Sequence, residues 1–172
     1  MNVSSQPKTL GIAISVLAVL IAGGFLVHQV HSDESKPQLT KSYTNDTYRF
    51  SLMMPAGFAT TEGTELDPNA STTVLLQNRA GDGVQILISL WDEPASALTP
   101  ERVTQDTELT VTNAQPIAIP GGVGISFNSD NDAFDGASSD IWFVHDGTVY
   151  ELTTYARLDP LLHAMFATWR FY

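Results

Sequence analysis

From Tyr43 onward, apolar and polar residues alternate with the period of two that is typical of half-buried β-strands. One strand is predicted within YRFSLMMP (48–55), where every second side chain is apolar and the proline ends the run. The segments TTVLLQN (72–78) and VQILISLW (84–91) are separated by the glycine-containing turn RAGDG, so they predict a β-hairpin. In the second segment Leu87 and Trp91 oppose the main apolar face, which indicates that part of the second face is covered too.

The second half of the chain continues this pattern with two more strand pairs. Strands are predicted around 110–119 and 123–129, with Pro120-Gly121-Gly122 as the turn between them. The segments SDIWFVHD (139–146) and TVYELTTYA (148–156) meet at Asp146-Gly147. This dipeptide favours a tight hairpin, because both of its residues tolerate the positive φ that such a turn needs.

Two segments change to a helical pattern. Thr99 suits an N-cap, Pro100 the first helical position and Glu101 the positive end of the helix dipole, so a short helix is predicted to about Asp106. Asp159-Pro160 has the same form and predicts a second capped helix. Its apolar stripe consists of Leu161, Leu162, Met165 and Phe166.

About seven strands and two helices predict an α+β domain, in which an antiparallel sheet is flanked by helices. A pure β-sandwich is the alternative, and the two proline-started helices count against it. The domain is expected to span 43–172.

The N-terminal segment LGIAISVLAVLIAGGFLV (10–27) is about as long as a membrane-spanning helix needs. We expect a transmembrane anchor over 10–30, a cytoplasmic tail at 1–9 and a polar linker at 31–42. The short tail favours a cytoplasmic N-terminus and an extracytoplasmic domain. The count of basic residues on the two sides of the segment is not decisive, since Lys8 precedes it and Lys36 and Lys41 follow it. A signal peptide cleaved near 22–24 is the alternative.

The net charge and the absence of cysteine exclude several classes of function. The formal net charge is −11, and an acidic chain repels phosphate backbones, so nucleic-acid binding is not expected. The 172 residues contain no cysteine, which excludes disulfides, thiolate nucleophiles and cysteine-bound metals.

The order of these elements resembles the PsbP-like group of the Mog1/PsbP fold. The group's aromatic strand leading to P-x-G-aromatic is similar to YRFSLMMPAGF, with Pro55, Gly57 and Phe58. Its I-x-I-x-G-x-x-G turn is similar to IAIPGGVG (117–124), and its aromatic tail to Thr168, Trp169 and Phe171. The resemblance implies an antiparallel sheet between helical layers and a binding or assembly role, and it carries over no catalytic residue.

The stretch NSDNDAFDGASSD (128–140) is the strongest candidate for a metal site. An EF-hand loop needs oxygen ligands at positions 1, 3 and 5, glycine at 6 and glutamate at 12, and no register of this stretch fits. A looser calcium site formed by Asp130, Asp132 and Asp135 is one hypothesis. A solvated loop between two strands is the other, because Asn, Asp, Gly and Ser are typical of turns.

His145 beside Asp146 suggests an oriented imidazole, and Ser126 would be the matching nucleophile of a hydrolase. However, the chain lacks G-x-S-x-G, and Ser126 lies within a predicted strand. His163 is expected at the surface or rim of the last helix, with no second histidine at i+4 to bind zinc.

Trp91 and Trp142 are predicted to point away from the main core. They would lie either on a second covered face or in an exposed patch that binds a partner. These features favour a membrane-anchored, extracytoplasmic, non-catalytic module that binds a protein or cell-envelope partner. A calcium-dependent envelope module and an envelope hydrolase are the alternatives.

Overall fold

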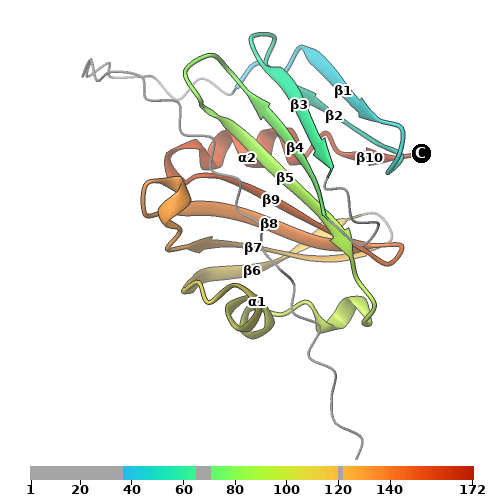
Figure 1. Cartoon of the computed structure of the whole chain (residues 1–172), viewed down its shortest axis with the longest axis vertical. Helices are drawn as coiled ribbons and strands as arrows, with labels where there is room; N and C mark the ends of the chain where they lie inside the picture. The colour runs from blue at the N-terminus through green and yellow to red at the C-terminus, as the bar shows by residue number, and fades with distance from the viewer. Residues whose placement is uncertain (1–36, 65–70, 120–121) are drawn as a thin grey trace, which may run out of the picture.

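The computed structural model describes residues 37–64, 71–119 and 122–172, which form two antiparallel sheets (Figure 1). The small sheet has the strand order β1-β2-β10, and the large sheet has the order β3-β4-β5-β9-β8-β7-β6. The strands of the small sheet are β1 (Lys41–Asn45), β2 (Phe50–Met54) and β10 (Arg170–Phe171). Those of the large sheet are β3 (Ala59–Thr64), β4 (Thr72–Gln77), β5 (Gly83–Leu90), β6 (Val111–Ile119), β7 (Gly122–Ser129), β8 (Ser138–His145) and β9 (Thr148–Tyr155).

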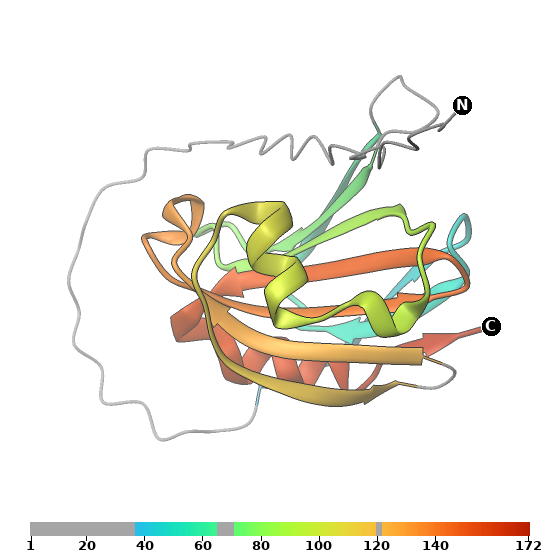
Figure 2. The ribbon, with the colours of Figure 1, turned by 90° about the horizontal axis from the view of Figure 1, so that it is seen from below.

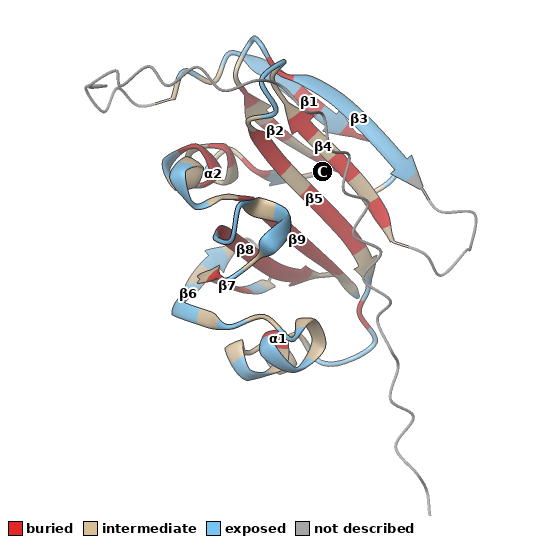
Figure 3. Cartoon of the chain, turned by 60° about the vertical axis from the view of Figure 1, so that its left-hand side comes forward, coloured by how far each residue is buried: buried red, intermediate tan, exposed pale blue. Residues whose placement is uncertain are grey.

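Two α-helices lie on opposite faces of the large sheet (Figure 2). Helix α2 (Asp159–Phe166) packs with the small sheet on one face, and α1 (Pro100–Thr107) covers the other. Three short 3₁₀ turns complete the described elements: η1 (Ala95–Ala97), η2 (Asp132–Phe134) and η3 (Ala156–Leu158). Since both faces are covered, burial is concentrated along the central strands β5, β9 and β8 (Figure 3).

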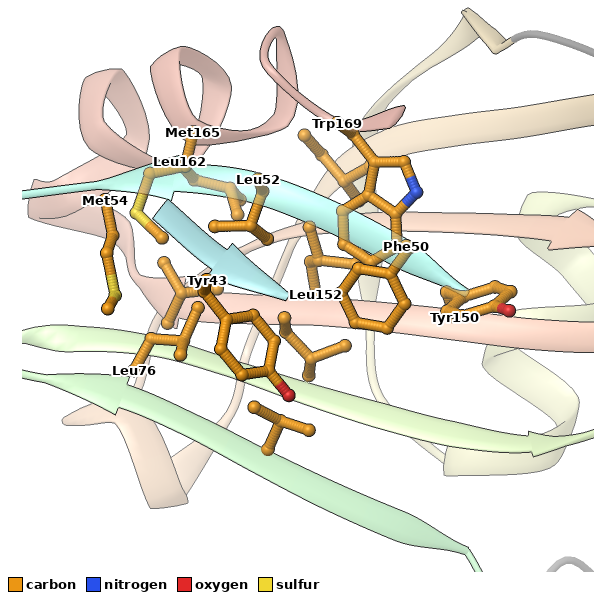
Figure 4. Close-up of a cluster of buried hydrophobic side chains, with 14 of the residues drawn as sticks. Tyr43, Phe50, Leu52, Met54, Leu76, Tyr150, Leu152, Leu162, Met165 and Trp169 are labelled. Carbon is orange, nitrogen blue, oxygen red and sulfur yellow. The ribbon is translucent and has the colours of Figure 1, made fainter. Parts of the chain in front are cut away.

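The main core lies between the large sheet, the small sheet and α2 (Figure 4). Its centre is aromatic: the ring of Phe50 on β2 stacks on Trp169 with centroids 4.0 Å apart, and Phe143 stacks on Tyr150 at 5.0 Å. Phe50 also meets Tyr150 edge to face at 5.9 Å. These contacts join the small sheet, the end of α2 and the central hairpin into one unit.

The predicted hairpins and the first helix are confirmed. The turn between β8 and β9 is Asp146-Gly147, with φ of 46° and 72°, as the predicted tight turn requires. Thr99 caps α1, because its side chain accepts a hydrogen bond from the Arg102 amide at 3.2 Å. The predicted turn at 120–122 lies largely outside the described residues.

Three predictions were wrong in detail. Asp159 is the first residue of α2 and not its N-cap; its carboxylate accepts a hydrogen bond from the Ser139 hydroxyl at 2.5 Å instead. The domain begins before Tyr43, since Lys41 and Ser42 already pair with β2 and Leu39 packs on the core. The strands form two sheets and not one, because β1, β2 and β10 pair only with one another in the described residues.

The predicted cytoplasmic tail, the anchor and the linker up to residue 36 lie outside the described residues. Within the described ranges, no helix is long and apolar enough to cross a membrane.

Replacing Phe50 with alanine is expected to destabilise the domain by about 3–5 kcal/mol, because the ring is fully buried and its loss leaves a cavity between the two sheets. Urea unfolding at neutral pH measures the change. The control is Leu90→Ala, at a side chain that is 69% exposed, for which we expect a change within about 0.5 kcal/mol. Similar losses for both variants would show that the aromatic cluster does not hold the sheets together.

Candidate functional site

Three segments meet at one end of the domain and enclose a surface pocket of about 330 Å³. The segments are the β1–β2 turn, the β8–β9 turn and the last two residues of the chain, which lie at the same end in Figure 2. The lining residues are 47–49, 145–146, 148, 150 and 171–172. We call this cavity the end pocket.

One wall of the end pocket is aromatic. The imidazole of His145 stacks on Phe171 with ring centroids 3.7 Å apart, and Tyr150 meets Phe171 edge to face at 5.5 Å. Burial, together with the neighbouring Tyr48 and Asp146, raises the pKa of Tyr150 to about 12, so its phenol stays neutral at ordinary pH. The Nδ1 atom of His145 is buried without a hydrogen-bond partner in the described residues, while Nε2 lies 3.4 Å from the Asp146 carboxylate.

Arg49 and Tyr172 line another part of the end pocket. The guanidinium carbon of Arg49 lies 6.0 Å from the centre of the Tyr172 ring, and the Tyr172 amide donates to the Arg49 carbonyl at 3.1 Å. The Tyr172 hydroxyl donates to the Asp46 carboxylate at 2.9 Å, and its pKa is raised, first by burial and then by this bond. Arg49 itself has φ of 52°, in the left-handed region that side chains other than glycine rarely adopt.

The structure does not bring together the predicted hydrolase pair. Ser126 on β7 lies opposite Ile141, four residues along β8 from His145, which corresponds to about 13 Å at the rise of a β-strand. Ser126 instead lines a separate polar cavity of about 200 Å³ beside Asp159 and His163. There the Asp159 carboxylate lies 3.3 Å from His163 Nε2 and accepts the Ser139 hydroxyl, an arrangement that ties the start of α2 to β8.

The three aspartates proposed for calcium have separate environments. Asp130 accepts the Thr110 amide at 2.5 Å, and hydrogen bonds from Thr110 lower its pKa. Asp132 lies in η2, and Asp135 ends this turn with φ of 57°. Across 37–64, 71–119 and 122–172, no group of three or more His, Asp or Glu side chains is placed to hold a metal. The geometry therefore gives the calcium hypothesis no support, and it stays untested.

Trp91 and Trp142 lie on a second covered face and not in an exposed patch. Each is 7% exposed, and both belong to a second apolar cluster between the large sheet and α1. Leu98 and Val103 cover them from the α1 side, because the capped helix turns its one buried side chain toward the sheet.

Two buried carboxyl groups lie on this second face, and the sequence interpretation missed both. Asp140 accepts hydrogen bonds from the hydroxyls of Ser129, Ser138 and Thr153, at 2.7–3.0 Å, which partly offset the rise in pKa that burial causes. Burial, with the nearby charges of Asp140 and Asp106, raises the pKa of Glu151 to about 8. One sequence signal pointed to this region: the apolar residues Leu87 and Trp91 indicated that the second face of the sheet is covered. Glu151 lies beside Leu87 on that face, so it is buried with it.

Comparison with known proteins yields a likeness of fold. No family model matches the chain, and no curated protein matches it significantly. The solution structure of cyanobacterial PsbP (CyanoP) from Synechocystis sp. PCC 6803 is similar with a TM-score of 0.54 and 12% identity, over 77% of this chain and 92% of that one. A crystal structure from Bacteroides thetaiotaomicron VPI-5482 has a TM-score of 0.46 and 12% identity, over 78% of this chain and 49% of that one. The described domain therefore has a PsbP-like fold.

Proposed function

We propose that this chain is a membrane-anchored, extracytoplasmic binding module without catalytic activity, and that its end pocket receives a protein or cell-envelope partner. The observation that carries the proposal is the convergence of Arg49, His145 and aromatic rings from three distant segments at one end of the domain. Aromatic faces and an arginine are the groups that most often contribute binding energy at interfaces.

The backbone of Arg49 supports this assignment. A left-handed conformation costs a residue with a Cβ about 1–2 kcal/mol, whereas glycine adopts it freely. Strain of this kind is a reason to look for a role of the side chain. Here the strained residue places a permanent positive charge beside the Tyr172 ring in a domain whose chain is strongly acidic.

The surroundings of His145 favour binding over hydrolysis. Its ring is held flat against Phe171, and Ser126 lies in another cavity, so the nucleophile and base that a hydrolase needs are not adjacent. The proposed membrane attachment rests on the apolar run at 10–27, which is about as long as a membrane-spanning helix needs.

Arg49→Gly is expected to unfold at higher urea concentration than Arg49→Ala, with a difference of about 1 kcal/mol. Both variants lose the guanidinium, and only glycine relieves the left-handed backbone, so the comparison isolates the strain. Equal stabilities would show that the turn relaxes and that the conformation stores no energy.

Binding is tested by affinity capture from membranes of the source organism, solubilised in mild detergent. Arg49→Ala and Tyr172→Ala are expected to reduce capture of the partner at least tenfold, a change that corresponds to about 1.4 kcal/mol. Arg79→Ala is the matched control, because this arginine lies in the exposed β4–β5 turn at the opposite end of the large sheet. Undiminished capture by the pocket variants would contradict the assignment of the site. Hydrolase turnover that is lost in Ser126→Ala or His145→Ala would contradict the non-catalytic role.

Membrane attachment is tested by fractionation. The full chain is expected in the membrane pellet after a carbonate wash, and a variant lacking 10–30 in the soluble fraction, because an apolar segment of this length partitions into the bilayer. A full chain that stays soluble without detergent would contradict the proposed anchor.

A further inference from the structure

Helix α1 covers the second face of the large sheet with little apolar contact of its own. It has eight residues and a single buried side chain, Val103. A helix of about two turns is not stable alone, so its position depends on packing against the sheet. In Figure 2 it lies, with the η1 segment, across the face opposite α2.

One arginine fixes α1 to the segment that follows β5. The Arg102 guanidinium pairs with Asp106 on α1 and with Glu93 on the preceding segment, both at 2.7 Å, and lies 5.2 Å from the Trp91 ring. Glu93 is 41% exposed, so these ion pairs contribute modestly to stability. The cover is therefore held by few interactions compared with the main core.

Glu151 lies under this cover at the centre of the sheet. It pairs with Trp142 on β8 and with Leu87 on β5, and it is 8% exposed. The acidic groups near it are Asp140 from β8 and Asp106 from α1, and Asp106 is paired with Arg102 on the same helix. The indole nitrogen of Trp142 is also buried without a partner in the described residues.

We propose that α1 is a proton-controlled cover: when Glu151 loses its proton, α1 and the 91–99 segment separate from the second face and expose the second apolar cluster, including Trp91 and Trp142. This device is independent of the proposed binding role of the end pocket. Its physical basis is that the Glu151 carboxyl group accepts no hydrogen bond from the described residues and lies near two other acids, while Arg102, the cation on α1, is already paired with Asp106 and Glu93.

The expected pH dependence follows from proton linkage. In the closed form burial raises the pKa of Glu151 to about 8, whereas in the open form the solvated carboxyl has its ordinary pKa of about 4.3. Opening therefore releases a proton between these values, and the open fraction rises about tenfold per pH unit until it levels off near pH 8.

The absence of cysteine from the chain allows a direct test. Val103→Cys is introduced into the full chain, and its labelling by a neutral thiol reagent is measured from pH 6 to 9. Each rate is divided by the rate of the urea-unfolded chain at the same pH, so that thiol ionisation cancels. The matched control is Val74→Cys on β4, which is buried in the main core and reports opening of the whole domain.

We expect the relative labelling of Val103→Cys to rise about tenfold per pH unit up to pH 8 and to exceed that of Val74→Cys throughout. Adding Glu151→Gln removes the titrating group at nearly constant volume and is expected to abolish the rise. Equal rates for the two cysteine variants would overturn the proposal, because the second face would then open only with the whole domain. An unchanged pH dependence in the Glu151→Gln background would overturn it as well.

Acrylamide quenching of tryptophan fluorescence provides a second measurement without a cysteine variant. Trp91 and Trp142 belong to the second cluster, whereas Trp169 belongs to the main core. Quenching is expected to increase between pH 6 and 8.5 in the unmodified chain and to stay constant in Glu151→Gln. Constant quenching in the unmodified chain would contradict the proposal that α1 separates from the second face.

Discussion

The stack of Phe50 on Trp169 is the contact on which the rest of the architecture depends. Phe50 comes from the small sheet and Trp169 from the segment that follows α2, and both rings rest on Phe143 or Tyr150 of the central hairpin. Thr168 strengthens the same junction, because its hydroxyl accepts the Met53 amide at 2.8 Å and donates to the Met165 carbonyl at 2.6 Å. The aromatic rings bury large apolar surfaces at this junction, and Thr168 ties β2 to the end of α2 through its two hydrogen bonds.

The end pocket is an extension of this aromatic core to the surface. Phe171 follows Trp169 by two residues, so it continues the same packing and reaches His145 at the end of β8. The pocket is consequently lined on one side by groups that the core holds rigidly. The turn at Arg49, which also lines the pocket, is held by its backbone bond to Tyr172.

The two faces of the large sheet are stabilised in different ways. The α2 face is built from aliphatic and aromatic side chains, whereas the α1 face combines a smaller apolar cluster with two buried carboxyl groups. Three hydroxyl donors compensate Asp140, while Glu151 lies between Leu87 and Trp142 in the sheet and near two other acids. Because an uncompensated buried charge is costly, the second face is the weaker of the two, and its stability depends on protonation.

Most of the local elements could be predicted from short stretches of sequence. The period of two, the Asp146-Gly147 turn and the Thr99-Pro100 helix start are set by side-chain direction, tolerance of positive φ and capping, which are properties of neighbouring residues. Strand β3 (ATTEGT) was not predicted, because it has few apolar residues. It forms through backbone hydrogen bonds to its neighbour β4.

Which of these elements meet could not be predicted from local patterns and became visible only in the folded domain. The tertiary structure divided the strands between two sheets, separated Ser126 from His145, buried Trp91 and Trp142 and brought Arg49, His145 and Tyr172 to one pocket. It also placed Asp159 on Ser139 instead of on its own helix amides. The physical reason is that these outcomes depend on contacts between residues far apart in the chain, whose pairing is selected by the burial of the whole core and not by any local pattern.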